Sequence, residues 1–204
     1  FQIFLLFILS LFLSLVLLRK IGSFNLTTSI LLIASFYLFF ITIRDFFSKS
    51  LLKYSQKISH FGFSLLVLSI LLNSIFSKEV VTNLRIGENF SLNDEIIKFV
   101  SIKVNNEKNY QSIKGVFEII DIKKKVLILK PEIRIYDQPK TVTSEADIKT
   151  SLYLDKFLVM NHVEGNDFFN VRYQVKPFMI WIWISAMIIA VGGIFALSKK
   201  SYEK

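Results

Sequence analysis

The chain has 204 residues, 52% of them hydrophobic, and a mean hydropathy of +0.50, an apolar excess typical of proteins with lipid-facing segments. Its net charge is +9, but the segment from Lys78 to Lys176 holds 16 basic and 14 acidic residues, a balance of only +2. The remaining excess lies beside apolar runs, which indicates a membrane protein and argues against a nucleic-acid-binding face. The absence of Cys excludes disulfides, thiolate zinc sites and a Cys nucleophile.

Four apolar stretches are long enough to cross the hydrocarbon core, which needs about 20 apolar residues in a helix. They cover residues 1–18, 26–43, 58–76 and 178–197. The first begins inside an apolar run with neither an initiator Met nor the basic flank of a signal peptide, so we expect a clipped transmembrane helix at the start of a fragment. Polar side chains inside the spans are expected to bond to helix carbonyls or to neighbouring helices.

The short connections between these stretches predict their orientation. Basic residues dominate between the second and third stretches and again after the fourth: Arg44, Lys49, Lys53, Lys57, Lys199, Lys200 and Lys204. Basic loops favour the cytoplasmic or matrix side. We therefore expect the long segment between the third and fourth stretches to lie outside, on the other side of the membrane.

The long segment, residues 77–177, has the pattern of a β-domain. Runs rich in β-branched and aromatic residues cover 97–104, 116–122, 126–129, 152–160 and 168–175, and Lys123-Lys124-Lys125 suits a hairpin turn. Gly87, Gly115 and Gly165 are interpreted as breaks between strands. The prediction is three membrane helices over 1–76, an external all-β domain of five to seven strands, a small barrel or sandwich, over 77–177, and a last helix with its tail over 178–204.

His60 is the most informative single residue, because it lies near the start of the third apolar stretch, in Ile58-Ser59-His60-Phe61-Gly62-Phe63. An ionisable side chain in a membrane span is costly without a partner, and a neutral imidazole is a common axial ligand of heme iron. Gly62 would let a flat macrocycle or another helix approach the backbone. The alternative is an interfacial histidine that bonds a lipid headgroup or a carbonyl, and position alone leaves both interpretations open.

Other polar residues have plainer explanations. His162 lies in the polar stretch 161–167, where a solvated turn is expected. Glu145, Asp147 and Asp155 are spread along β and loop segments, which favours a solvated face over a carboxylate site. The sequence shows no Ser-His-Asp order, phosphate-binding loop or His/carboxylate metal spacing, and it identifies no catalytic residue.

The last apolar stretch has features of a membrane helix and its boundary. Trp181 and Trp183 are expected at the membrane interface, and Pro177 at the start of the helix. Gly192 and Gly193 predict a close contact with another helix.

Several short motifs occur in an order and spacing that resemble the C-terminal part of the CcmF/NrfE family of cytochrome c heme lyase subunits. They are His60-Phe61-Gly62, Ile86-Gly87-Glu88, Asn109-Tyr110, Leu129-Lys130-Pro131-Glu132-Ile133-Arg134-Ile135-Tyr136, Ser144-Glu145-Ala146, and Lys176-Pro177 followed by Trp181-Ile182-Trp183 and Gly192-Gly193. The fourth, L-x-P-E-x-R-x-Y, is the most specific. Ser144 and Ser151 depart from the family's usual Thr and Asp, so roles at these two positions do not carry over.

The resemblance implies a role for His60 as one of two axial ligands of a heme b held in the membrane, with Gly62 at a close approach. The partner ligand, a Trp-rich external motif and two external histidines belong to an N-terminal part that this sequence lacks. In the family, a second heme from a chaperone is attached to the Cys-x-x-Cys-His of apocytochrome c. A bis-histidine heme suits electron transfer, so the resident heme is expected to reduce the incoming heme iron.

Three functions compete at this point: a piece of a heme lyase, truncated or naturally split; a non-catalytic membrane-anchored β-domain that docks assembly partners; and a transporter or secretion scaffold. The third ranks last, because the spans lack the charges and broken helices of a midplane substrate site. The resemblance implies four kinds of protein partner: an N-terminal half, a heme chaperone, apocytochrome c and other lyase subunits. Composition and charge distribution add membrane lipid as a partner and exclude nucleic acid. The expected location is a bacterial inner membrane with the β-domain in the periplasm, or a mitochondrial inner membrane with it in the intermembrane space.

Overall fold

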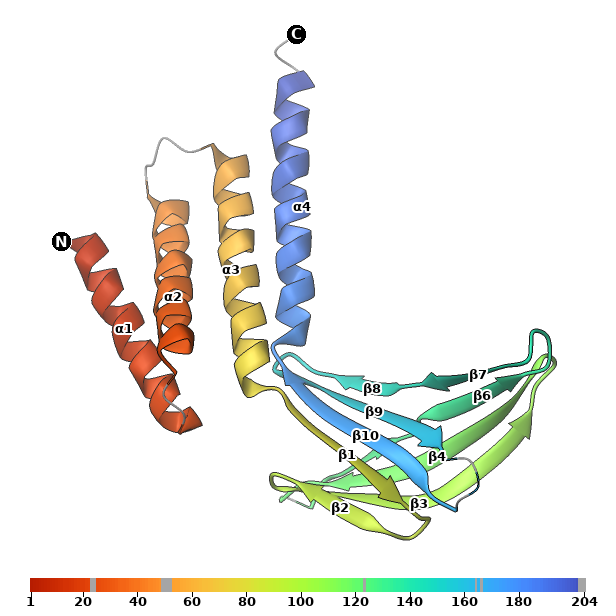
Figure 1. Ribbon diagram of the computed structural model, residues 1–204. Coiled ribbons are helices and arrows are strands. Elements are labelled where there is room, and N and C mark those ends of the chain that lie inside the picture. The colour runs from red at the N-terminus through yellow and green to blue at the C-terminus, as the bar shows by residue number, and fades with distance from the viewer. Residues whose placement is uncertain (23–24, 49–52, 123, 164, 166, 202–204) are drawn as a thin grey trace. The chain divides into compact units, whose positions relative to one another are not determined.

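The chain folds as two units in the computed structural model, which describes residues 1–22, 25–48, 53–122, 124–163, 165 and 167–201, the last four by their backbone only. One unit is helical and comprises Phe1–Phe76 and Phe178–Lys204; the other is β-rich and comprises Ser77–Pro177. Figure 1 shows the helices and the strands with the labels used below. The predicted fold class, apolar helices with an all-β domain, is confirmed.

The helical unit contains four helices that are long and apolar enough to cross a membrane: α1 (Gln2–Ile21), α2 (Leu26–Phe47), α3 (Tyr54–Phe76) and α4 (Met179–Ser201). Local signals define two of their ends. Gly22, with a φ of 72°, closes α1 in the left-handed conformation that glycine adopts without strain. The Asn25 side chain accepts a hydrogen bond of 3.0 Å from the Thr27 amide and so caps the start of α2.

The helices lie side by side in chain order, and each packs against the next helix in the chain (Figure 1). Small hydroxyl residues fill the contacts: Ser10, Ser14, Ser29, Ser35, Thr42, Ser64, Ser69 and Ser185 are all buried. Most bond to a carbonyl one turn earlier, as Ser14 does to Ser10 at 2.8 Å. Thr42 and Ser64 bond across the α2–α3 contact at 2.6 Å. Small residues let membrane helices approach closely, and the expectation that polar side chains bond to carbonyls and neighbouring helices is confirmed.

The β unit is a sandwich of two antiparallel sheets (Figure 1). One sheet has the order β1-β10-β9-β8 and the other the order β2-β3-β4-β6-β7, with β5 paired to β4. The strands are β1 (Lys78–Leu84), β2 (Asn89–Leu92), β3 (Glu95–Asn106), β4 (Tyr110–Ile120), β5 (Val126–Leu129), β6 (Glu132–Tyr136), β7 (Thr141–Glu145), β8 (Asp147–Thr150), β9 (Leu154–His162) and β10 (Phe169–Pro177). β1 pairs with β10, so the first and last strands of the sandwich are neighbours.

The core lies between the sheets and is built from alternate strand residues. Phe99 of β3 and Phe117 of β4 stack with ring centroids 4.4 Å apart, and both are fully buried. Leu158, Met160 and Tyr173 of the other sheet complete the centre of the core. Alternation of apolar and polar residues along a strand produces this single buried face.

Three details of the β prediction are wrong. The described residues form ten strands, not five to seven, because short strands such as β7 and β8 carry polar residues on both faces. Gly115 is not a break but lies inside β4, where a Cβ atom would come within 2.7 Å of Met160 Sδ. Pro177 ends β10 instead of starting a helix, and Phe178, with a φ of 60°, separates it from α4.

The predicted lysine turn is correct in outline. β4 and β5 form a hairpin in which Ile120 faces Val126 and the Lys124 amide donates to the Asp121 carbonyl at 2.8 Å. Lys123 lies outside the described residues.

Candidate functional site

His60 lies in the second turn of α3 and its side chain is exposed. Among the described residues no hydrogen bond to its imidazole is found. The orientation of His60 follows from helix geometry, in which each residue advances by about 100°. Gly62 and Ser59 face α4, about 160° and 100° around α3 from His60, whereas Ser64, which bonds to Thr42 of α2, lies only about 40° away. His60 is therefore exposed beside the α2–α3 contact and points away from α4.

Gly62 marks the contact between α3 and α4. A Cβ atom on Gly62 would lie 2.9 Å from Ile188 Cγ2 and 2.9 Å from Ile189 Cγ1. Of the two partners considered for this glycine, the structure places a helix beside it, about 160° around α3 from His60. Contact of Gly62 with a heme stays a prediction.

Gly192 makes the matching approach from α4. Its Cβ position would contact Ser59 Oγ and lie 2.8 Å from the Ser59 backbone nitrogen and 3.0 Å from the Ser55 carbonyl oxygen. Gly193, in contrast, has no atom within 4 Å of its Cβ position among the described residues. The predicted close contact therefore belongs to Gly192 alone.

The face of α3 that carries His60 is apolar. Phe63, three residues after His60, and Ile70 are exposed on the same stripe, and Gln56 precedes His60 by one turn. Farther along this stripe, Val67, Ile70, Leu71 and Ser74 form one wall of a groove of about 380 Å³; α2 forms the other wall with Leu31, Ala34, Ser35 and Leu38. An exposed imidazole on an apolar helix face has the donor chemistry and the surroundings that an axial heme ligand needs.

Contacts with α2 hold α3 in this rotation. The Phe61 ring packs against Phe39 and Phe46, with centroids 5.9 and 6.2 Å away. Lys57, buried one turn before Phe61, donates from Nζ to the Ser48 carbonyl at 2.8 Å, at the C-terminal end of α2. A lysine here satisfies a terminal carbonyl and complements the negative end of the helix dipole.

Three of the sequence motifs meet on β4, β6 and β7. Tyr110 faces Tyr136 across the β4–β6 ladder, with ring centroids 5.3 Å apart, and the Arg134 guanidinium lies 5.1 Å from the Tyr110 ring centroid. Glu132 faces Glu145 of β7 in the next ladder. The Asn-Tyr, L-x-P-E-x-R-x-Y and Ser-Glu-Ala motifs are therefore one structural cluster, which the sequence could not show.

Glu132 is the buried charge of this cluster, with 8% of its surface exposed. Arg134 Nε lies 3.2 Å from Glu132 Oε1, and Lys114 Nζ lies 4.0 Å from Oε2. Burial raises the pKa of the Glu132 carboxyl, but the hydrogen bond from Arg134 and the charges of Arg134 and Lys114 outweigh it, so the pKa lies below its ordinary value. The same hydrogen bonding raises the pKa of Arg134. The arrangement holds β6 against β4 by charge.

A second polar network joins the two sheets. Glu95, at the start of β3, accepts a hydrogen bond of 2.7 Å from the Tyr173 hydroxyl and forms an ion pair of 2.5 Å with Lys156 of β9. Burial, and then the hydrogen bond to Glu95, raise the pKa of Tyr173. The sequence pattern carries no signal for this network, because Glu95 is 61 residues from Lys156 and 78 residues from Tyr173 along the chain.

The remaining candidates are scattered. His162 is the last residue of β9, not a turn residue, and its ring packs edge-on against Phe169 at 5.3 Å. Asp147 accepts from the Lys130 amide at 2.6 Å, and Glu145 is exposed. Asp155 is buried, contrary to the expectation of a solvated face. Among the described residues no three His, Asp or Glu side chains form a group that could hold a metal ion.

The fold and these sites define a class: a membrane protein in which an antiparallel β-sandwich is inserted between two apolar helices, one of them with an exposed histidine. Residues 75–177 match the family described as the CcmF C-terminal beta-sandwich. The chain belongs to this family of cytochrome c-type biogenesis proteins, as the motifs predicted.

The relatives are bacterial. The chain is 27% identical over 195 residues to cytochrome c-type biogenesis protein CcmF of Pseudomonas fluorescens, covering 89% of this chain and 30% of that protein. It is 32% identical over 117 residues to cytochrome c-type biogenesis protein ccl1 of Rhodobacter capsulatus, covering 57% of this chain and 18% of that protein. The solved structure of Cytochrome c Heme Lyase CcmF matches with a TM-score of 0.71 and 16% identity, over 95% of this chain and 33% of that chain, and shares the fold.

Proposed function

We propose that this chain is the C-terminal portion of a cytochrome c heme lyase and that His60 is an axial ligand of a heme b within the membrane. The supporting observation is the exposure of the His60 imidazole on α3, on the stripe that borders the apolar α2–α3 groove and away from α4. A bound heme would supply one-electron redox chemistry there. Phe63, one turn along the same face, would pack against the flat macrocycle and help exclude water.

The rest of the proposal is based on the family to which the chain belongs and on the fraction of its relatives' length that the chain covers. The chain spans about 30% of the length of the Pseudomonas CcmF proteins, so the opposing heme ligand would come from the remaining part of the family's length. Apocytochrome c, a heme chaperone and other lyase subunits would be its partners. We place the protein in a bacterial inner membrane, with residues 77–177 as the external domain in the periplasm.

The test is an absorption spectrum of the detergent-purified protein, co-expressed with the N-terminal part of a protein of this family. The chain contains a second histidine, His162, which lies in the β unit and therefore provides a matched control. We expect a low-spin b-type spectrum that is lost or becomes high-spin in His60→Ala and is unchanged in His162→Ala. Identical spectra in all three proteins would remove His60 from the site.

The convergence of three motifs on β4, β6 and β7 supports a second candidate function, a membrane-anchored domain that docks assembly partners without holding heme. The same spectra distinguish the two functions. If the intact complex contains no heme, the docking function is the better account.

A further inference from the structure

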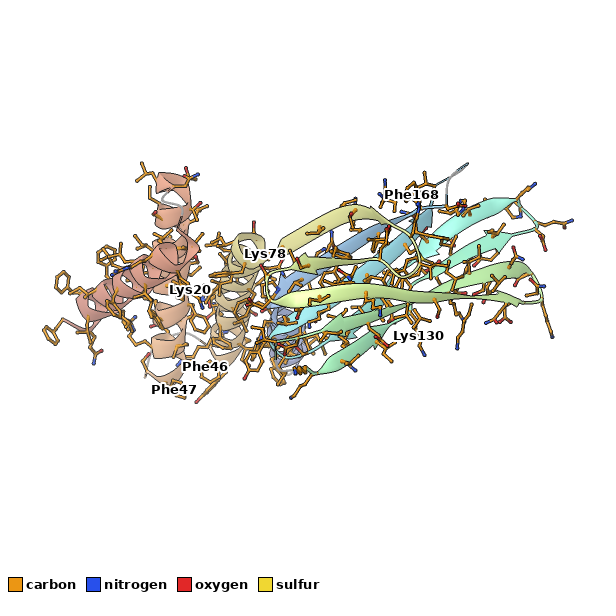
Figure 2. All side chains as sticks on the ribbon, turned by 90° about the horizontal axis from the view of Figure 1, so that it is seen from below. Lys20, Phe46, Phe47, Lys78, Lys130 and Phe168 are labelled. Carbon is orange, nitrogen blue, oxygen red and sulfur yellow. The ribbon has the colours of Figure 1, made fainter. Side chains whose placement is uncertain are left out.

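One end of the β-sandwich carries both of its chain connections to the apolar helices. β1 begins two residues after α3 ends, and β10 ends two residues before α4 begins. Lys78 and Val175 face each other in the β1–β10 ladder, so both connections leave from the same end. Figure 2 labels Lys78 at this end, and Phe168, which precedes the opposite end of β10. We call the first the connected end and the second the distal end.

The β8–β9 turn lies at the connected end. Pro177 faces Leu154 in the β10–β9 ladder, and neighbouring strands are about 4.8 Å apart. The turn is fixed by hydrogen bonds between Ser151 and Leu154, including 2.7 Å from Ser151 Oγ to the Leu154 carbonyl. At its tip, Leu152 is 58% exposed and Tyr153 is 73% exposed. Tight turns favour Gly, Asn, Asp and Ser, so two large apolar side chains at a tip require an explanation.

The β4–β5 hairpin brings a third apolar side chain to the same end. Glu95 pairs with Lys156, whose strand neighbour is Val175, so the start of β3 lies at the connected end. Ile96 faces Ile120 in the next ladder, and Ile122 follows two residues later with 69% of its surface exposed. Lys78 Nζ also donates to Asn93 Oδ1 at 2.9 Å, which ties the β2–β3 turn to this end.

The turns at the distal end are different in character. The β3–β4 turn is Glu107-Lys108-Asn109 and the β6–β7 turn is Asp137-Gln138-Pro139-Lys140. In the described part of the distal end, Ile86, in the β1–β2 turn, is 54% exposed, and Val142, just after the β6–β7 turn, is 66% exposed. Among the described turn tips, the connected end carries three exposed large apolar side chains, Ile122, Leu152 and Tyr153, and the distal end carries Ile86.

We infer that Ile122, Leu152 and Tyr153, the apolar rim, insert into the interfacial layer of the phospholipid bilayer that α3 and α4 cross. The headgroup layer adds roughly 5–7 Å to each side of the hydrocarbon core, which is within reach of a turn paired to Pro177. Tyr is favoured in this layer because its ring is apolar and its hydroxyl remains hydrated. Lys124 and Lys125, beside Ile122, are long enough to place their ammonium groups among lipid phosphates.

The absence of Cys permits a direct test in the full chain. Single variants Tyr153→Cys and Ile122→Cys would carry an environment-sensitive fluorophore in vesicles of phosphatidylcholine and phosphatidylglycerol. Lipids with a nitroxide near the top of the acyl chain would act as quenchers. Lys108→Cys serves as a polar control at the distal end, and Ile86→Cys as an apolar control that reports insertion caused by the fluorophore itself.

If the apolar rim lies in the interfacial layer, the fluorophore at positions 153 and 122 should emit at shorter wavelength than at positions 108 and 86. It should also be quenched several-fold more strongly there by the nitroxide lipids. If either rim position matches the distal controls, the inference is wrong. This result is independent of the heme spectrum, because it concerns side chains of the β unit only.

Discussion

Replacement of Gly192 by alanine should weaken the α3–α4 contact, whereas the same replacement at Gly193 should not. The Cβ atom at position 192 would lie 2.8 Å from the Ser59 backbone nitrogen, where ordinary contacts begin at 3.4 Å. Because backbone cannot rotate away like a side chain, α3 must retreat by about 0.6 Å, the difference between these two distances, and lose packing along the interface.

The expected magnitude combines two opposing effects. Alanine is a better helix former than glycine by about 0.8–1.0 kcal/mol, and both variants gain this. Overpacking costs about 1–3 kcal/mol, and only Gly192→Ala has this cost. Gly193→Ala should therefore be neutral or stabilising, and Gly192→Ala less stable than Gly193→Ala by about 1–3 kcal/mol.

The assay is unfolding of the full chain in detergent micelles, followed by helical circular dichroism as SDS is titrated. The two variants differ by one position in the same helix, so changes in expression or micelle binding should affect both. Equal free energies of unfolding for the two alanine variants would refute the close approach of Gly192 to Ser59.

Two further predictions concern the β unit. Phe117→Ala should lower the free energy of unfolding of the sandwich by about 3–5 kcal/mol, because it removes a fully buried ring stacked on Phe99. Urea denaturation, monitored by the circular dichroism of the strands, measures this loss. A loss below about 1 kcal/mol would contradict the stacked core. Glu132→Gln should destabilise the sandwich near neutral pH but little in acid. The folded-state pKa of Glu132 is depressed, so its stabilisation is present above the unfolded-state pKa and is lost as pH falls through the folded-state value. Urea denaturation of both proteins across this range tests the sign, and a difference that grows in acid would contradict it.

Composition and periodicity predicted the helices because membrane spans require long apolar runs with few alternatives. Strands β3, β4 and β5 were also predicted, since Ile97, Phe99, Phe117 and Ile119 follow the two-residue alternation of a half-buried sheet. β6 was missed, although Ile133 and Ile135 alternate with Glu132 and Arg134, because Lys130-Pro131 directly precedes it and two of its five residues are charged.

Residues that depend on a partner from another strand or helix could not be predicted. Gly115 resembled a strand break because the sequence does not show that Met160 and Phe117 fill the space beside it. The face of α3 that carries His60 follows from helical spacing, but only the packing of α2 and α4 shows that His60 itself is exposed. Likewise, the motifs containing Tyr110 and Arg134 could be recognised separately, but their contact depends on the β4–β6 register.

The pairing of β1 with β10 affects the association of α3 with α4. A flexible connection of about 100 residues costs roughly 3 kcal/mol more loop-closure entropy than a turn of about four residues. Because the first and last strands of the sandwich are hydrogen-bonded neighbours, folding of the sandwich brings both ends of this connection together. The loop-closure entropy is then lost when the sandwich folds and not when α3 and α4 associate. The β unit thus acts, for the two helices that flank it, as a short connection, so unfolding of the sandwich should loosen the α3–α4 pair.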